Sequence, residues 1–256
     1  MSISDKRFMV MCDEDVKKDQ LQQLNYEQAD EDAKYDENEL RKRYRSFYNV
    51  VVKRCLDFLF ALIAIIIFSP VLIIVALAII IDTGLPVFYR AERGGYKDRN
   101  FRIFKFRTMI KNADKIGGGT TALNDSRITK VGKILRKTKL DELAQLFNIL
   151  SGKMSFIGPR PELTRYTDNY DQMEKNILMV RPGLSDYSSI QFINLDEIVG
   201  EGNADEIYEK YVYKKKNQLR LKYVSKISFF VDAGLFFKTI FQVIKKCFRV
   251  LFRKKK

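Results

Sequence analysis

The sequence predicts an α+β protein that is mostly helical, with an N-terminal membrane helix, a small cytosolic domain containing short strands, and amphipathic helices at the membrane interface. Three features lead to this fold class. Residues 58–81 form an apolar run without charges, residues 85–106 contain short extended segments, and apolar residues farther along recur at helical spacing. The 256 residues are enough for one medium-sized domain beside a membrane element, because domains commonly have about 100–200 residues.

The apolar run is long enough to enter a bilayer. Its 24 residues would make about 36 Å of helix at roughly 1.5 Å per residue. Ser69-Pro70 at its centre predicts a helix-break-helix, because proline lacks a backbone donor and clashes with the preceding turn. Both flanks are basic, so a straight span has no single cytoplasmic end. A re-entrant hairpin is therefore preferred over a straight span, with the Ser69 hydroxyl satisfying a carbonyl freed at Pro70.

Charge and composition divide the chain into four segments. Residues 1–40 carry 5 basic and 12 acidic residues and predict a mobile or partly helical cytoplasmic tail, whereas the remainder carries 41 basic and 20 acidic residues. The remaining net charge of +21, from 41 minus 20, predicts a polyanionic partner: nucleic acid, anionic lipid or a phosphorylated substrate. The later segments are an amphipathic approach and membrane hairpin (41–84), the domain that carries the chemistry (85–225), and an interfacial helix with a basic tail (226–256).

The missing residue types restrict the chemistry. The chain contains no histidine, which excludes histidine general bases, histidine-ligated zinc and histidine-containing triads. Its three cysteines are far apart in sequence, which indicates reduced thiols on the cytosolic side rather than a disulfide framework. Catalysis must therefore use carboxylate, Lys, Tyr, Ser, Thr or Cys side chains.

The coarse pattern of the third segment predicts short strands followed by helices. Strands are expected at 85–88 and 101–106, on either side of a turn at Gly94-Gly95, and helices at 128–135 and 140–150. A further amphipathic helix is expected over 227–252. The loop with Gly117-Gly118-Gly119 is a weak candidate for phosphate contact, since it lacks the ending of a P-loop.

Asp141 and Glu142 are the candidate catalytic carboxylates. They begin an apolar helical pattern, and adjacent helical residues diverge by about 100°, so the two side chains can perform different tasks at one site. The alternative is structural: Thr138 with Asp141 fits a capping box, in which an acid is favoured at a helix start. The pair alone favours the cap.

Cations along the chain favour the catalytic interpretation, because they supply ligands for phosphate. Prolines on both sides of Arg160 restrict its backbone and would hold the guanidinium in place, although a surface arginine in a rigid turn is the ordinary alternative. Arg181 likewise precedes a proline-glycine turn. The candidate phosphate-binding residues are Lys105, Arg107, Arg136, Arg160 and Arg181.

Five motifs also follow one another in a recognisable order: the Ser69-Pro70 break, KFRTM (105–109), LDEL (140–143), SGKMSFIGPRPEL (151–163) and VRPG (180–183). Together, over residues 53–244, they resemble the monotopic phosphoglycosyl transferases. These bacterial sugar transferases start glycan assembly on polyprenyl phosphate. The resemblance implies a catalytic domain over 85–225 at the inner (cytoplasmic) membrane of a bacterium, with that domain and both termini facing the cytoplasm.

By this resemblance, Asp141 would attack the sugar-bearing phosphorus of a UDP-sugar and expel UMP. The resulting phosphosugar on the carboxylate would then pass to polyprenyl phosphate, so that one displacement becomes two. Asp141 and Glu142 would hold Mg²⁺, and Glu142 would be either a metal ligand or a proton carrier. UDP-sugar, polyprenyl phosphate and anionic lipid are the expected partners.

Two positions depart from the family pattern. Ala144 stands where members often have proline, and residues 184–189 (LSDYSS) replace a common threonine-glycine-tryptophan pattern, so the sugar is the least secure inference. A non-catalytic membrane-surface adaptor is the alternative function. Nucleic-acid binding is not expected, because the basic residues flank apolar helices as membrane contacts do. The sequence leaves open whether the chain forms a homodimer.

Overall fold

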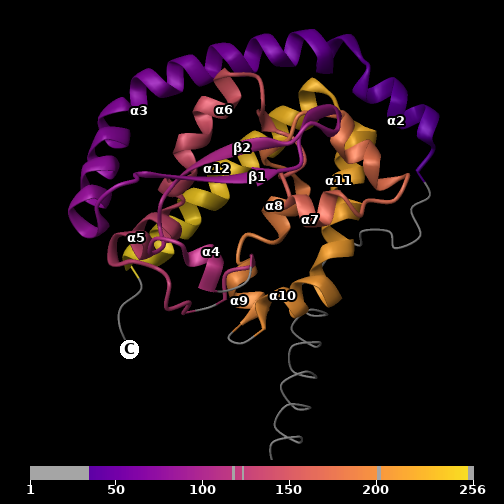
Figure 1. Ribbon diagram of the computed structural model, residues 1–256. Helices are drawn as coiled ribbons and strands as arrows, with labels where there is room; N and C mark the ends of the chain where they lie inside the picture. The colour runs from indigo at the N-terminus through magenta and orange to yellow at the C-terminus, as the bar shows by residue number, and fades with distance from the viewer. Residues whose placement is uncertain (1–34, 117–118, 123, 201–202, 253–256) are drawn as a thin grey trace, which may run out of the picture.

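A computed structural model describes residues 35–116, 119–122, 124–200 and 203–252 of the chain. The expectations for residues 1–34 of the acidic tail, for Gly117-Gly118 and for the final basic residues 253–256 lie outside the described residues. Within the described part the chain is mostly helical with a few short strands, which confirms the predicted fold class at that level (Figure 1).

The helices differ greatly in length, from single turns to the long helices α3 and α12. The α-helices are α2 (Glu37–Tyr44), α3 (Lys53–Thr83), α4 (Ala113–Ile116), α5 (Lys130–Thr138), α6 (Leu146–Leu150), α7 (Thr164–Thr167), α8 (Tyr187–Gln191), α9 (Leu195–Val199), α10 (Ala204–Ile207), α11 (Tyr213–Lys226) and α12 (Phe229–Phe252). The 3-10 segments are Tyr96–Asp98, Leu140–Gln145 and Glu174–Met179, and the π-helical segments are Tyr48–Val52 and Tyr208–Val212. The strands are β1 (Phe88–Arg93), β2 (Phe101–Phe106), β3 (Ser155–Ile157) and β4 (Gly183–Ser185).

The apolar run forms one continuous helix rather than the predicted helix-break-helix. Pro70 lies inside α3, which arches over one side of the protein (Figure 1). The Ser69 hydroxyl donates to the Ile66 carbonyl at 2.8 Å. That carbonyl is four residues before Pro70 and cannot receive the usual helical hydrogen bond. The predicted role of Ser69 is therefore confirmed, and the side chain lets the helix continue through the proline. The re-entrant path of this helix in a membrane stays a prediction.

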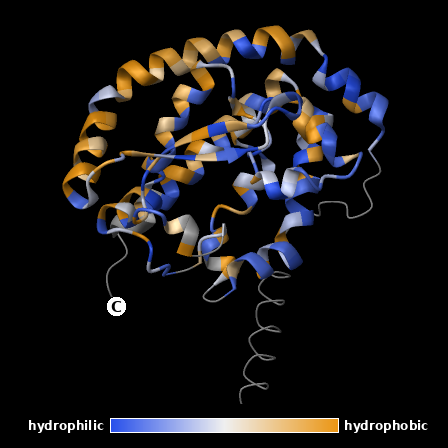
Figure 2. Cartoon of the chain, in the orientation of Figure 1, coloured by the Kyte–Doolittle hydropathy of each residue, from blue (hydrophilic) through white to orange (hydrophobic). Residues whose placement is uncertain are grey.

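The outer surface of α3 is apolar and uncovered. Figure 2 shows α3 as predominantly hydrophobic and the preceding α2 as hydrophilic. The helical stretch Tyr48–Thr83 is long and apolar enough to cross a membrane, and only 11% of its most apolar window is buried in the protein. Ile81 is 85% exposed, and Ile66, Ile67, Ile73 and Ile74 are also exposed. A soluble core helix would bury such residues, so α3 is suited to contact lipid.

A second apolar surface lies on α12, where the sequence predicted an interfacial helix. Phe230 is 84% and Phe237 69% exposed. The buried carboxylate of Asp232, near the start of α12, ties this helix to two others. It accepts hydrogen bonds from Tyr48 at 2.7 Å and Tyr223 at 2.8 Å and pairs with Lys53 at the start of α3. The start of α3, the C-terminal end of α11 and the start of α12 are thus held together at Asp232.

Two small sheets lie between these helices. β1 and β2 form an antiparallel hairpin in which Phe88 faces Phe106 and Arg93 faces Phe101. β2 was predicted correctly, whereas the first strand begins at Phe88 instead of occupying 85–88, because the residues that pair with β2 follow the proline at 86. β3 and β4 pair in parallel, with Ser155 opposite Gly183. The second sheet joins the SGKMSFIGPRPEL and VRPG motifs.

Candidate active site

Asp141 and Glu142 lie in the 3-10 segment Leu140–Gln145, not at the start of a capped α-helix. Lys139 adopts a left-handed conformation (φ 60°) that ends α5 and starts the 3-10 segment. The Thr138 hydroxyl turns back and donates to the Ile134 carbonyl of α5 at 2.8 Å. The capping-box alternative is therefore wrong. The predicted helix over 140–150 is instead a 3-10 segment followed by the short helix α6.

The hairpin brings Lys105 to both carboxylates. Asn148 of α6 fixes the edge of β2, accepting from the Phe104 amide at 2.7 Å and donating to the Arg102 carbonyl at 3.0 Å. Lys105, the next residue along β2, places its Nζ 3.3 Å from Asp141 Oδ2 and 3.3 Å from Glu142 Oε1. One ammonium group therefore bridges the acid pair.

The second sheet brings Arg160 to the other side of Glu142. β3 and β4 approach so closely at Gly158 and Gly183 that a Cβ on Gly183 would lie 2.2 Å from the Gly158 nitrogen. Arg160 follows this crossing. Its Nη1 donates to the Leu184 carbonyl at 2.8 Å, and its Nη2 pairs with Glu142 Oε1. The sequence predicted that the two prolines hold the Arg160 guanidinium in place. The hydrogen bond to the Leu184 carbonyl of β4 restrains it further.

The two carboxylates differ in their surroundings. Burial alone would raise the pKa of Glu142, but Arg160, Lys105 and Lys139 outweigh it and hold that pKa well below its ordinary value. Glu142 is therefore ionised at neutral pH. Asp141 is 5% exposed, and its Oδ1 has no hydrogen-bond partner. An unpaired carboxylate oxygen in a buried setting is costly, which marks this oxygen as available for chemistry.

The other three predicted phosphate ligands lie in different surroundings. Arg107 donates to Thr83 and Gly84 at the end of α3, and Arg136 donates to Thr108 at 3.4 Å. Arg181 donates to the Gly152 carbonyl at 3.2 Å and stacks over Tyr96 at 4.8 Å. Within the part of the chain that the structure describes, no hydrogen bond or ion pair joins these arginines to the acid pair. Their contact with substrate phosphate stays a prediction.

The acid pair can be tested for its fit to Mg²⁺. Among the described residues no group of three or more Asp, Glu, Cys or His side chains forms a cage for a metal. Mg²⁺ does not need one, since it is commonly held by one or two carboxylates together with substrate phosphates and water. The adjacent carboxylates of Asp141 and Glu142 supply oxygens of this kind, so the donor set fits Mg²⁺ that arrives with a phosphorylated substrate.

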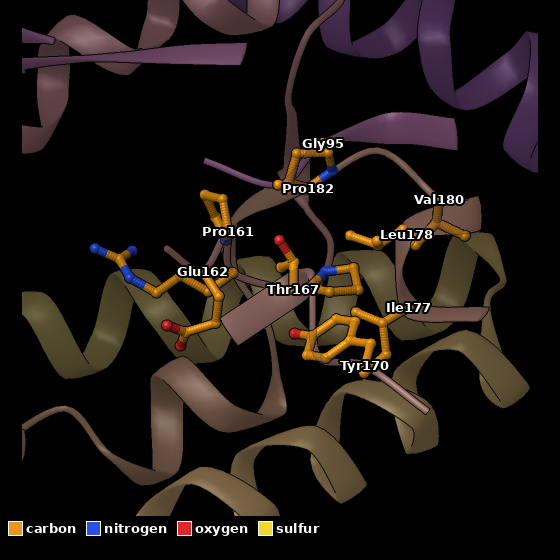
Figure 3. Close-up of a pocket in the computed structure, with 12 residues that line it drawn as sticks. Gly95, Pro161, Glu162, Thr167, Tyr170, Ile177, Leu178, Val180 and Pro182 are labelled. Carbon is orange, nitrogen blue, oxygen red and sulfur yellow. The ribbon is translucent and has the colours of Figure 1, made fainter. Parts of the chain in front are cut away.

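A small pocket lies beside Arg160, between the SGKMSFIGPRPEL and VRPG motifs. It is lined by Pro159, Pro161 and Pro182 together with Glu162 and Tyr170 (Figure 3). Its volume of about 10 Å³ has room for roughly one water molecule. A nucleotide sugar does not fit there, and neither Asp141 nor Glu142 lines this pocket.

Sequence reasoning missed several residues of this site. Asn148 fixes β2, and Asp186 accepts from the Arg160 backbone amide at 3.3 Å. Lys139 was not singled out either, although it helps to lower the pKa of Glu142. Its place beside the acid pair was the available signal. Asn148 and Asp186 carried none, because their roles depend on contacts between distant segments.

The acid pair, contacted by a lysine and an arginine on a body with two exposed apolar helices, is an arrangement suited to phosphate chemistry near a membrane. The comparisons specify it further. The family described as bacterial sugar transferase matches residues 48–246. The chain belongs to this family, in agreement with the resemblance seen in the motifs.

Three curated relatives show the range of the family. The chain is 35% identical to UDP-N-acetylgalactosamine-undecaprenyl-phosphate N-acetylgalactosaminephosphotransferase of Aeromonas hydrophila over 80% of this chain and 46% of the relative. It is 34% identical to UDP-glucose:undecaprenyl-phosphate glucose-1-phosphate transferase of Klebsiella pneumoniae over 76% and 40%. It is 33% identical to the exopolysaccharide production protein ExoY of Rhizobium meliloti over 74% and 84%. The chain thus spans less than half the length of the first two relatives.

Proposed function

We propose that this protein transfers a sugar 1-phosphate from a UDP-sugar to polyprenyl (undecaprenyl) phosphate. The products are UMP and a polyprenyl-diphosphate sugar, and the reaction is the first membrane step of a bacterial glycan pathway. The observation that carries the proposal is the Asp141 carboxylate, which is buried, has one oxygen without a partner and lies beside Lys105. The family supports the general reaction, since the names of two relatives specify this kind of transfer.

In the first step, Asp141 Oδ1 attacks the phosphorus that bears the sugar. The bond from that phosphorus to the oxygen bridging the two phosphates breaks, and UMP leaves with that oxygen. The acyl phosphate holds the sugar phosphate on Asp141. A phosphate oxygen of the polyprenyl phosphate then attacks the same phosphorus and releases the carboxylate. Lys105 and Arg160 offset the negative charge of both displacements.

Glu142 is proposed to act as a fixed negative charge rather than as a proton carrier. An efficient proton carrier has a pKa near the working pH, whereas three cations hold the pKa of Glu142 far below that range. Asp141 and Glu142 would hold Mg²⁺, which supplies charge neutralisation for the diphosphate of the donor. Of the two roles that the sequence left open for Glu142, we therefore propose the metal ligand.

The membrane position is part of the same proposal. The acceptor phosphate lies at the surface of a bilayer, and α3 and α12 both present exposed apolar residues. We propose that α3 enters the inner membrane as a hairpin and that α12 lies on anionic lipid, with the catalytic domain and both termini in the cytoplasm.

The direct test is release of UMP. The full chain in detergent micelles, supplied with Mg²⁺, polyprenyl phosphate and a panel of UDP-sugars, is expected to release UMP with at least one donor. Asp141→Asn removes the nucleophile without changing side-chain size and is expected to abolish release. Lys133→Gln, at an exposed position on α5, is the matched control and should leave it unchanged. Full turnover by Asp141→Asn would contradict the assignment of the nucleophile.

The same assay separates the alternative function. A membrane-surface adaptor would release no UMP from any donor, while still binding vesicles through α3 and α12. The adaptor explains the apolar surfaces but gives no reason for a buried acid pair bridged by Lys105, and we therefore favour the transferase.

A further inference from the structure

One face of the β1–β2 hairpin continues beyond the acid pair. In the ladder, Tyr89 faces Lys105, Ala91 faces Ile103 and Arg93 faces Phe101. Side chains alternate along a strand, so Tyr89 and Arg93 are on the same face as Lys105. Directly opposed residues have Cβ atoms about 4.5–5.5 Å apart. Tyr89 is therefore the immediate neighbour of the lysine that bridges the two carboxylates.

The far end of this face meets the segment that follows Arg160. Arg93 forms an isolated antiparallel bridge with Leu163, and the Gly94 amide donates to the Glu162 carbonyl at 3.1 Å. The end of β1 is thus attached to the same short segment that carries Arg160. The face consequently runs from Lys105 past Tyr89 to Arg93, beside Arg160.

Arg93 supplies a positive charge near Arg160 that is not paired with a carboxylate in the described part of the chain. Its nearest acid, Glu162, already pairs with Lys216 and Arg220. Within the described part of the chain, the Arg93 guanidinium has neither a hydrogen bond nor an ion pair within 4.0 Å. Burial and the nearby Arg160 both lower the pKa of Arg93, and Glu162 and Tyr89 partly offset this decrease. Two guanidinium groups near each other are relieved by an anion between them.

Tyr89 supplies an open aromatic ring. The residue is 42% exposed, and within the described residues its side-chain hydroxyl makes no hydrogen bond. Its hydroxyl is within electrostatic reach of Arg93 and of Arg127. An exposed aromatic ring next to cations is suited to bind a nucleotide, because the base can stack on the ring and the phosphate can pair with the arginine.

We propose that Tyr89 and Arg93 form the subsite for the nucleotide half of the donor, a nucleoside diphosphate. Tyr89 stacks with the base, and Arg93 together with Arg160 binds the phosphate that leaves as the nucleoside monophosphate. The inference rests on the proposed function and adds to it the direction of the donor: the nucleotide extends along the hairpin, and the sugar-bearing phosphorus is at Asp141.

The test measures binding of UDP to the full chain in detergent micelles by isothermal titration calorimetry. Tyr89→Leu and Arg93→Gln are each expected to weaken UDP binding about tenfold or more, because stacking on one base is worth about 1–3 kcal/mol. Tyr89→Phe keeps the ring and should bind UDP as the parent does. Arg90→Gln is the matched control, since Arg90 is on the opposite face of β1, over Phe104 at 4.2 Å. The kcat/KM for polyprenyl phosphate should be unchanged in Tyr89→Leu, Tyr89→Phe and Arg90→Gln, because it reports only the second displacement and none of these side chains is proposed to contact phosphate.

The outcomes separate this inference from the proposed function. Unchanged UDP binding by both Tyr89→Leu and Arg93→Gln would overturn the subsite alone. A fall in the kcat/KM for polyprenyl phosphate in Tyr89→Leu, without a loss of UDP affinity, would also overturn it and would assign the Tyr89 ring to the acceptor. Failure of the parent protein to bind UDP would contradict the proposed function itself. If Arg93→Gln fails to fold, the comparison of Tyr89→Leu with Tyr89→Phe decides, because that side chain is exposed.

Discussion

Glu162 is the residue on which the packing around Arg160 depends most. Its Oε1 accepts from Tyr208 at 2.6 Å and from Lys216 at 3.2 Å, and it pairs with the fully buried Arg220. Burial would raise the pKa of Glu162, but Lys216 and Arg220 outweigh it and hold the pKa well below the ordinary value of 4.5. Two cations are therefore kept inside the protein by one carboxylate, two residues from Arg160.

Removing this carboxylate should destabilise the fold. Glu162→Gln leaves Lys216 and Arg220 buried without their counter-charge, which costs roughly 3–5 kcal/mol. Urea unfolding in detergent micelles measures the loss. Glu209→Gln is the control, because Glu209 is exposed and accepts one hydrogen bond from Tyr166 at 3.0 Å, and it should change stability by about 0.5 kcal/mol or less.

The pH dependence has a definite sign. A carboxyl whose folded pKa is depressed contributes stability above its unfolded pKa and loses it as the pH falls toward the folded pKa. The parent should therefore lose stability as the pH falls below 4.5, the ordinary value for this group, and Glu162→Gln should lose less over the same range. Equal slopes for the two proteins would contradict the account of Glu162.

At the residue scale, the sequence singled out Asp141, Glu142, Lys105 and Arg160 as candidates because they lie in motifs that follow one another in order, and the structure places these four side chains together. The sequence was not sufficient to exclude the capping box, which the left-handed Lys139 and the Thr138 hydroxyl exclude. The neutral Asn148 could not be singled out, since its amide joins α6 to a strand 44 residues earlier along the chain.

At the scale of elements, α3 is the least ordinary part of the fold. Length and composition predicted an apolar helix, and the structure adds that Ser69 carries the helix through Pro70. The sequence predicted that the Ser69 hydroxyl satisfies a carbonyl freed at Pro70, but it still predicted a break at the proline. This single hydroxyl removes the penalty of the freed carbonyl, and a continuous helix results. Such local compensation depends on a rotamer, which the sequence pattern does not determine.

The membrane path of α3 predicts a labelling pattern. In a variant whose three native cysteines are replaced by serine, single cysteines at the exposed positions Lys42 and Asp168 lie before and after the helix. A hairpin places both in the cytoplasm, so both should resist a membrane-impermeant maleimide in intact cells and react after permeabilisation. Labelling of Lys42→Cys in intact cells would instead support a straight span.

The shorter elements were harder to predict. α5 and α12 lie close to the predicted ranges, whereas β3 and β4 have only three residues each and pair across 28 positions of sequence, from Ser155 to Gly183. Strands so short carry little periodicity. Their pairing is fixed by the close approach of Gly158 to Gly183, and a contact of this kind is a property of the folded chain.

At the scale of the whole molecule, the apolar helices and the acid pair belong to one connected body. Asp232 joins the start of α3, the C-terminal end of α11 and the start of α12. Arg54 at the start of α3 donates to the Ile149 and Leu150 carbonyls at the end of α6. α6 follows directly after the segment that carries Asp141. The helix suited to lipid is therefore attached, through few intermediates, to the residues proposed to act on a lipid phosphate.

The central claim is that Asp141 carries the sugar phosphate between donor and acceptor, and it is tested most directly by mass spectrometry. The full chain is incubated with Mg²⁺ and UDP-sugars, among them UDP-glucose and UDP-N-acetylgalactosamine, without polyprenyl phosphate, and is then quenched in acid. The account predicts a mass increase of one sugar phosphate on the peptide containing Asp141, absent from Asp141→Asn and lost on addition of polyprenyl phosphate. Release of UMP on adding polyprenyl phosphate, with no adduct or with an adduct on another residue, would contradict it.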